Sequence, residues 1–328
     1  MENNTLHKLG IDIGSTTVKV AVLDEHDNLL FSDYERHFAN IRETLSSLIQ
    51  KAFDQLGDRK VAPMITGSGG LTLAKHLDVP FVQEVISVST ALQHYAPQTD
   101  VAIELGGEDA KIIYFEGGNV EQRMNGSCAG GTGAFIDQMA GLLGVTPDEM
   151  NDLALKAEKT YPIASRCGVF AKSDIQPLLN QGARKEDISA SIFQAVVDQT
   201  VSGLAQGRKI GGQVLFLGGP LTYLSALRKA FRTTLNLDEE HAILPENSSC
   251  YMAFGAALHA DTLAEEMTID EALDKIVNAK ATDNIVVGKP LFASREEYNA
   301  FVERHKKSDL KYEDIRTYRG DAYLGIDA

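Results

Sequence analysis

One order of segments occurs twice along the chain, and it constrains the fold more than any other feature. Near the N-terminus, β-prone residues flank a glycine turn at 14–17, and a helix pattern over residues 40–57 follows. From residue 101 the order restarts, with strand patterns around a glycine turn at 106–109 and helix patterns after residue 132. Because helices and sheets bury their apolar faces against each other, this order predicts two α/β lobes. We expect each lobe to hold a mixed β-sheet flanked by helices, and the two lobes to meet near the glycine turns.

Capping signals mark where several of the helices should begin. Asn40 and Glu43 have the spacing of a capping box, and Gly57 follows the last apolar position of that helix. Thr146 and Glu149 have the same spacing around a proline at the first helical position. These signals place one helix in the first lobe and another in the second.

The length of 328 residues suits about two lobes, and the C-terminal region differs from both. Tyr323–Asp327 reads YLGID and is similar to KLGID at Lys8–Asp12, so we interpret it as the start of a truncated second copy of the fold. The last helix of the second lobe can lead the chain back to the first lobe. The expected parts are a first lobe over 1–100, a second lobe over 101–265, a polar helical extension over 266–322 and the second copy from 323–328.

Composition excludes several classes of function. The net charge of −15 argues against nonspecific nucleic-acid binding, which needs a basic surface. No apolar run reaches the ~18 residues of a membrane helix, and the first residues lack a secretory signal, so we expect a cytoplasmic protein without a membrane partner. The three cysteines, Cys128, Cys167 and Cys250, are an odd number without CxxC spacing, which argues against a disulfide framework. Two cysteines per chain would complete a four-cysteine site if two copies met.

The first glycine turn has the residues of a phosphate-binding loop. Asp12 ends a predicted strand, where its carboxylate can hold Mg²⁺ through water. Backbone amides and hydroxyls of the turn can bind phosphate oxygens. Lys19 either reaches these phosphates or faces solvent. The turn residues are Gly14, Ser15, Thr16 and Thr17.

The second glycine turn repeats this design, and a third one follows later. Glu104 ends a strand, Gly106 and Gly107 turn the chain, and Glu108 and Asp109 come next. Two acid-bearing hairpins that face each other can clamp phosphates with a metal ion between them. Asp109 contacts this metal or caps the turn. A further strand ends in Gly218–Gly219, which allows the backbone to lie flat against a purine.

The chain resembles the actin, sugar-kinase and heat-shock chaperone ATPase superfamily. The features that carry this resemblance are, in chain order, the two hairpins, the helix after the second hairpin and the last glycine pair. The segments CAGGTG at 128–133 and RCGVFAKSD at 166–174 are similar to activators of 2-hydroxyacyl-CoA dehydratases and benzoyl-CoA reductases. The resemblance covers about residues 8–260. It implies an actin-like (ribonuclease H-like) fold, ATP hydrolysis with Mg²⁺, and delivery of low-potential electrons from ferredoxin or flavodoxin to a dehydratase-type or reductase-type enzyme.

The same resemblance implies a 4Fe–4S cluster at the interface of a homodimer, or of a pseudo-dimer with a second copy in a longer chain. Its ligands would be Cys128 and Cys167 of each copy, and Cys250 would only pack. The helix after Cys128 can stabilise thiolate charge through its N-terminal dipole. The nucleotide contacts would fall on Gly14, Ser15, Thr16, Thr17, Gly106, Gly107, Gly218 and Gly219, with Gly131, Thr132 and Gly133 opening the helix near the cleft.

Glu104 and Glu108 of the second hairpin depart from the pattern of these activators, as does Pro220 after the last glycine pair, and two other functions stay open. Glu104 stands where the family has aspartate, and Glu108 where it has glutamine. The candidates for orienting or activating water are therefore Glu104 and Glu108, while Glu108 could also bind metal or weaken hydrolysis. The alternatives are a small-molecule kinase without a cluster and a nucleotide-dependent binding module with little turnover.

Overall fold

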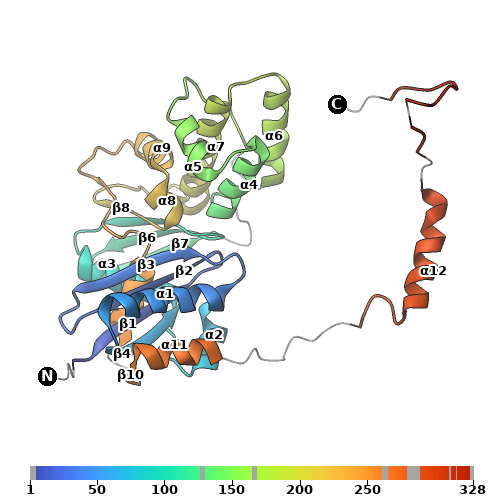
Figure 1. Ribbon diagram of the computed structural model, residues 1–328. Coiled ribbons are helices and arrows are strands. Elements are labelled where there is room, and N and C mark those ends of the chain that lie inside the picture. The colour runs from blue at the N-terminus through green and yellow to red at the C-terminus, as the bar shows by residue number, and fades with distance from the viewer. Residues whose placement is uncertain are drawn as a thin grey trace. The chain divides into compact units, whose positions relative to one another are not determined.

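The computed structural model describes residues 5–125, 130–164, 168–260, 265–278, 289–309, 312–314 and 316–325. The chain forms two compact units, Met1–Lys280 and Ala281–Ala328. In the first unit, each lobe is built on a five-stranded mixed sheet, as the sequence predicts (Figure 1). None of the described helices is both long and apolar enough to cross a membrane.

The first sheet carries the first glycine turn. Its strand order is β10-β4-β1-β2-β3, with β1 antiparallel to β2 and parallel to β4. One face of β1 and β2 is apolar at alternate positions, so it packs on helices α1, α2 and α11. The elements are β1 (His7–Ile13), β2 (Thr17–Leu23), β3 (Leu29–Arg36), α1 (Ile41–Leu56), β4 (Lys60–Thr66), α2 (Gly70–Leu77), β10 (Met267–Thr268) and α11 (Ile269–Asn278).

The second sheet repeats this topology in four of its five strands, and the edge strand differs, since β9 is parallel to β8 whereas β10 is antiparallel to β4. Its order is β7-β6-β5-β8-β9, and its central strand is antiparallel to the next strand in sequence and parallel to the one on its other side. A large apolar core joins its outer face to the helices of this lobe. The elements are β5 (Val101–Leu105), β6 (Ala110–Glu116), β7 (Asn119–Met124), α4 (Gly133–Leu143), α5 (Pro147–Ala154), α6 (Gly168–Asn180), α7 (Lys185–Thr200), a π-helical turn (Val201–Ala205), β8 (Val214–Leu217), α8 (Gly219–Tyr223), α9 (Ser225–Leu235) and β9 (Ala242–Ile243).

Two helices, α3 (Glu84–Tyr95) and α10 (Tyr251–His259), lie between the inner faces of the two sheets. They cross so closely that a Cβ at Gly255 would overlap the Ser87 carbonyl oxygen. A Cβ at Gly10 of β1 would likewise overlap the backbone of α10 at Ala253. The Ser87 hydroxyl donates a 2.6 Å hydrogen bond to the Met252 carbonyl. This middle layer joins the lobes and sets how their glycine turns face each other.

The structure differs from the sequence-based expectations in two places. Residues 266–278 were expected in a polar extension, but β10 pairs with β4, and Ile269 and Ile276 of α11 are buried in the first lobe. The apolar positions of α11 recur at helical spacing, so its burial follows the ordinary amphipathic rule. At α1, the Asn40 side chain makes no capping hydrogen bond, so that predicted capping box is wrong. The Thr146–Glu149 capping box is confirmed.

The second unit contains one α-helix among its described residues. Its helix α12 (Arg295–His305) begins at Ser294, whose hydroxyl accepts a hydrogen bond from the Glu297 amide. None of the residues of α12 is buried. Phe292, Tyr298 and Phe301 form a small aromatic cluster along it.

Candidate active site

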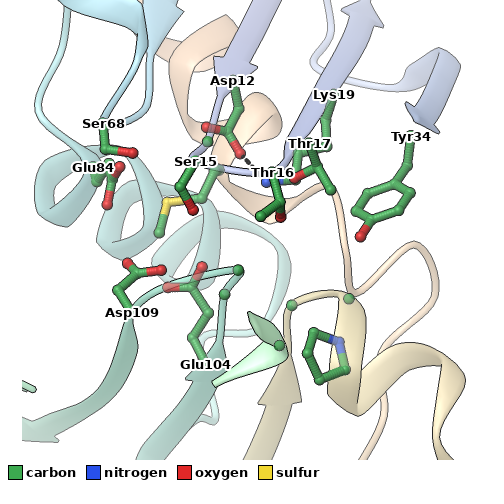
Figure 2. A pocket seen from close by; sticks show the side chains of 18 of the residues that line it. Asp12, Ser15, Thr16, Thr17, Lys19, Tyr34, Ser68, Glu84, Glu104 and Asp109 are labelled. Carbon is green, nitrogen blue, oxygen red and sulfur yellow. Dashed lines mark hydrogen bonds and ion pairs between the residues drawn. The ribbon is translucent and has the colours of Figure 1, made fainter. Parts of the chain in front are cut away.

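A narrow cavity of about 60 Å³ lies where the two hairpin turns approach each other (Figure 2). A Cβ at Gly107 would overlap the Thr16 hydroxyl and lie 2.8 Å from the Ser15 hydroxyl, so the two turns are in close contact and a larger residue at 107 would require these side chains to move. The structure brings most of the predicted residues together here. Those that line the cavity are Asp12, Gly14, Ser15, Thr16, Thr17, Lys19, Glu104, Gly106, Gly107, Asp109, Gly133, Gly218 and Gly219.

Asp12 and Lys19 form a buried ion pair at the end of β1. The two residues are cross-strand partners, and Lys19 Nζ lies 2.6 Å from Asp12 Oδ2. Burial lowers the pKa of Lys19, but the Asp12 charge and hydrogen bond outweigh it and raise that pKa above its ordinary value. Lys19 therefore stays charged and does not face solvent. Its ammonium also lies 5.9 Å from the centre of the Tyr34 ring.

Glu104 and Lys111 occupy the equivalent positions in the second lobe, since they are partners across β5 and β6. Here the ammonium has three carboxylate neighbours. Lys111 Nζ lies 2.7 Å from Glu84 Oε2, 3.4 Å from Glu104 Oε2, and in contact with Asp109. Burial lowers the pKa of Lys111, and the surrounding carboxylates reverse this and raise it well above its ordinary value. One fixed positive charge thus faces three acids at this end of the cavity.

The surroundings of Glu104 change its proton affinity. Burial raises its pKa to about 7, Asp109 and Glu84 add to the rise, and Lys111 opposes it. Its Oε2 atom is buried and accepts no hydrogen bond, because at 3.4 Å the ammonium contributes attraction without a hydrogen bond. A carboxyl with a pKa near neutrality and a free oxygen in a phosphate-sized cavity is suited to accept a proton.

The predicted metal role of Asp12 and Asp109 fits the donor chemistry of the cavity. Both carboxylates line it, and Mg²⁺ prefers hard oxygen ligands together with substrate phosphates. Each carboxylate is paired with a lysine, Asp12 with Lys19 and Asp109 with Lys111. Among the described residues, no group of three acidic, histidine or cysteine side chains is arranged to hold a metal ion alone. A metal bound here by Asp12 and Asp109 would take the rest of its ligands from water or phosphate oxygens.

Helix α4, which begins at the end of the CAGGTG segment, is hydrogen-bonded to the second glycine turn. The backbone amides of Gly133 and Ala134 donate hydrogen bonds of 2.9 and 2.7 Å to the carbonyls of Gly106 and Gly107. Of the predicted triplet, only Gly133 lines the cavity. Gly131, with a φ of +82°, packs on Gln199, and Thr132 is buried. Of the triplet, Gly133 thus contacts the second glycine turn directly.

Two larger cavities adjoin the central one at opposite ends. A groove of about 240 Å³ shares Tyr34, Arg36, Gly219 and other walls with it and continues to Tyr223. Here the ring centres of Tyr34 and Tyr223, one from each lobe, lie 5.6 Å apart, and Arg36 forms an ion pair with Asp137 of α4. The two tyrosine rings give this groove aromatic surface on which a planar base could stack.

The other cavity, of about 490 Å³, shares Ser15, Ser68 and Glu84 with the central one and has no wall in common with the Tyr34 groove. Glu108 lines this cavity and not the central one. Figure 2 shows Ser68, Glu84 and Asp109 at the end of the site opposite Tyr34. A nucleotide with its base near Tyr34 would thus point its terminal phosphate toward Glu104 and Asp109.

Several lining residues were not identified from the sequence, namely Tyr34, Arg36, Ser68, Glu84 and Met252. Tyr34 and Arg36 are the β3 partners of Lys19 and Thr17, so the register of the third strand could have found them. Glu84 had no such signal, because it enters the site through the packing of α3 between the sheets.

The cysteines divide into two groups. Cys128 and Cys167 lie outside the described residues. Cys250 is buried at the start of α10, and burial raises the pKa of its thiol to about 11, as for a packing residue.

Comparison with known proteins shows which protein family this chain matches. Residues 9–260 match the model of the BadF/BadG/BcrA/BcrD ATPase family. The chain is 29% identical over 260 residues to the (R)-2-hydroxyglutaryl-CoA dehydratase activating ATPase of Acidaminococcus fermentans, covering 78% of this chain and 97% of that protein. It is 29% identical to the activator of lactoyl-CoA dehydratase of Anaerotignum propionicum, covering 80% of this chain and all of that protein.

Solved structures agree with the sequence matches. Component A of the A. fermentans (R)-2-hydroxyglutaryl-CoA dehydratase superposes with a TM-score of 0.68 at 27% identity, covering 78% of this chain and 97% of that chain. The activator of the 2-hydroxyisocaproyl-CoA dehydratase from Clostridium difficile with bound ADPNP gives a TM-score of 0.67 at 26% identity, covering 84% and 98%.

Proposed function

The chain belongs to the BadF/BadG/BcrA/BcrD ATPase family, and on this premise we propose that it is an ATP-driven activator that delivers electrons to a dehydratase-type or reductase-type enzyme. Membership confirms the resemblance drawn from the motifs, and the actin-like fold is confirmed by the superposed activators. The observation that carries the proposal is the pair of facing hairpins, each with an acid and a lysine at equivalent positions.

Nucleotide binding would use the whole length of the cleft. The phosphates lie between the turn at 14–17 and Gly106–Gly107, and the nucleoside lies over Gly218–Gly219 beside Tyr34. Asp12 and Asp109 would hold Mg²⁺ together with phosphate oxygens. Glu104, at the terminal-phosphate end, accepts a proton from the attacking water. Two lysines, each anchored by carboxylates, keep positive charge next to the phosphates without closing the cavity.

The electron-transfer part rests on the relatives and on the two cysteine segments. The matched activators serve 2-hydroxyacyl-CoA dehydratases, and a more distant match is one of the subunits of the Thauera aromatica benzoyl-CoA reductase. Cys128 and Cys167 of two copies would hold one 4Fe–4S cluster, which would supply one-electron chemistry. The two copies form a homodimer or a pseudo-dimer within a longer chain. Ferredoxin or flavodoxin would be the electron donor.

The binding module with little turnover is the second candidate. The observation that favours it is the glutamate at position 104, which is longer than aspartate and partly shielded by Lys111. Steady-state ATP hydrolysis separates the two functions, because a binding module would retain nucleotide affinity and release almost no phosphate.

Anaerobic purification with iron and sulfide counted per chain tests the activator. The variants are Cys128→Ala and Cys167→Ala, and the matched control is Cys250→Ala, which removes a buried thiol from the middle layer. About two irons per chain in the wild type and the control, lost in both test variants, would support the cluster. A reconstituted dimer without iron that still hydrolyses ATP would refute electron delivery and leave the ATPase in place.

A further inference from the structure

His37 follows directly after β3 and is attached to the first phosphate turn at two points. Its backbone amide donates a 3.1 Å hydrogen bond to the Thr16 carbonyl. Its imidazole Nε2 lies 3.2 Å from the Gly14 carbonyl oxygen. The side chain is buried, so these contacts are made away from bulk water. His37 therefore contacts the carbonyls near both ends of the turn that carries Ser15.

A third hydrogen bond determines which imidazole nitrogen carries the proton. The Ala39 amide donates to His37 Nδ1 at 3.0 Å. Because a backbone N–H is always a donor, Nδ1 must be the unprotonated nitrogen and Nε2 must carry the hydrogen. The imidazole is therefore a donor to the Gly14 carbonyl.

The Gly14 hydrogen bond also orients the next amide. In a trans peptide the C=O and N–H groups point in opposite directions, and the described chain has no cis peptide bond. Since the Gly14 carbonyl points at the imidazole, the Ser15 N–H points away from it. Ser15 lines the central cavity. We infer that His37 is a positioning residue, which fixes the Gly14–Ser15 peptide so that the Ser15 amide can donate to a nucleotide phosphate.

The segment that holds the imidazole has an unfavourable backbone. Phe38 and Ala39 have φ values of 43° and 67°, which residues with side chains rarely adopt. The Asn40 amide donates a 2.6 Å hydrogen bond to the His37 carbonyl, and the Ala39 amide binds the imidazole, so His37 stabilises this conformation. Strain of this kind persists where the surrounding contacts enforce it, and it is common beside binding sites.

Two substitutions separate the contacts of the imidazole. The amide nitrogen of His37→Gln can occupy the place of Nε2 and donate to Gly14. The shorter His37→Asn can place its oxygen near Nδ1 and accept from Ala39, but it cannot reach Gly14. His26→Gln, at an exposed turn, is the control for replacing a histidine. This inference rests on the proposed nucleotide site, so the probes are MgADP and adenosine, which differ in their phosphates.

We expect His37→Asn to bind MgADP on the order of fivefold more weakly than wild type, the effect of one lost hydrogen bond, while adenosine affinity stays unchanged. His37→Gln and His26→Gln should bind MgADP within about twofold of wild type. The ratio of the two affinities is measured on each variant, so a smaller folded fraction does not alter it. An unchanged ratio in His37→Asn, or an equal loss in His37→Gln, would overturn the positioning role. A wild-type chain that binds neither probe would overturn the proposed nucleotide site and this inference with it.

Discussion

Glu104 Oε2 lies 3.4 Å from Lys111 Nζ, whereas the equivalent pair in the first lobe, Asp12 and Lys19, is in contact at 2.6 Å. The difference arises because Glu84 and Asp109 also attract Lys111, while Lys19 has only Asp12 as an ion-pair partner among the described residues. The duplicated hairpins have therefore diverged in chemistry. The first holds a stable ion pair, and the second leaves one carboxyl with a proton affinity suited to reaction near neutral pH.

We expect Glu104→Gln to reduce ATP hydrolysis by a factor on the order of 10²–10⁴, the usual contribution of a general base. MgATP affinity should change little, since the amide preserves the size of the side chain. Single-turnover hydrolysis together with equilibrium binding of MgATP measures both. Glu108→Gln is the comparison variant, because Glu108 lies in the adjoining cavity, and its rate should fall less than tenfold. The reverse ranking would assign the base to Glu108.

Hydrolysis should also depend on pH through Glu104. Only the ionised carboxylate can accept a proton, so the single-turnover rate should rise with pH and level off above about 7, the pKa to which burial raises this group. Glu104→Gln should remove this dependence from its residual rate. A wild-type rate that is flat between pH 5.5 and 8.5, chosen as about 1.5 units on either side of this pKa, would contradict the assignment.

The raised pKa of Glu104 also predicts that the free energy of unfolding decreases as the pH rises. The folded state binds the Glu104 proton more tightly than the unfolded state, whose ordinary pKa is 4.5. The contribution to the free energy of unfolding is therefore greatest below pH 4.5 and is lost as the pH rises through about 7. Between pH 5 and pH 8 this amounts to ~2 kcal/mol. Urea unfolding at pH 5 and at pH 8 measures this difference. The free energy of unfolding should fall between these pH values by about that amount more in the wild type than in Glu104→Gln. An equal fall in both proteins would contradict the raised pKa of Glu104.

The duplication of the two sheets was accessible from the sequence because each hairpin carries its own local signals. Asp12 and Glu104 were recognised for the same reason, since each ends a strand before a glycine turn. Glu84 could not be found in this way, because its place depends on how α3 packs between two sheets. Residues 266–278 were misplaced because the two-residue strand β10 is too short to show a period, and because the helical period of α11 indicates a buried face without showing which lobe covers it. Local chemistry was thus predictable, and contacts set by packing were not.

The ion pair between Arg36 and Asp137 joins the lobes beside the Tyr34 groove. Both side chains are more than a third exposed, so the pair contributes at most about 1 kcal/mol to stability. Its loss should instead accelerate nucleotide release, because the lobes separate more easily at this edge. We expect Arg36→Ala and Asp137→Ala each to raise the dissociation rate of MgADP about twofold to fivefold, in line with the small energy of an exposed pair. The double variant should add nothing further, and additive effects in stopped-flow measurements would refute the coupling.

Gly255 and Gly141 give the last prediction, a matched pair of glycine-to-alanine substitutions in helices. A Cβ at Gly255 would overlap the Ser87 carbonyl, so Gly255→Ala must push α10 away from α3 and should destabilise the chain by about 1–3 kcal/mol or more. At Gly141 of α4 a Cβ meets no atom within 4 Å, so Gly141→Ala should stabilise by about 0.5–1 kcal/mol through helix propensity. Chemical denaturation of both variants measures the two effects. Because α3 and α10 form the layer between the lobes, Gly255→Ala should also weaken MgADP binding, and unchanged binding would show that this layer does not set the cleft.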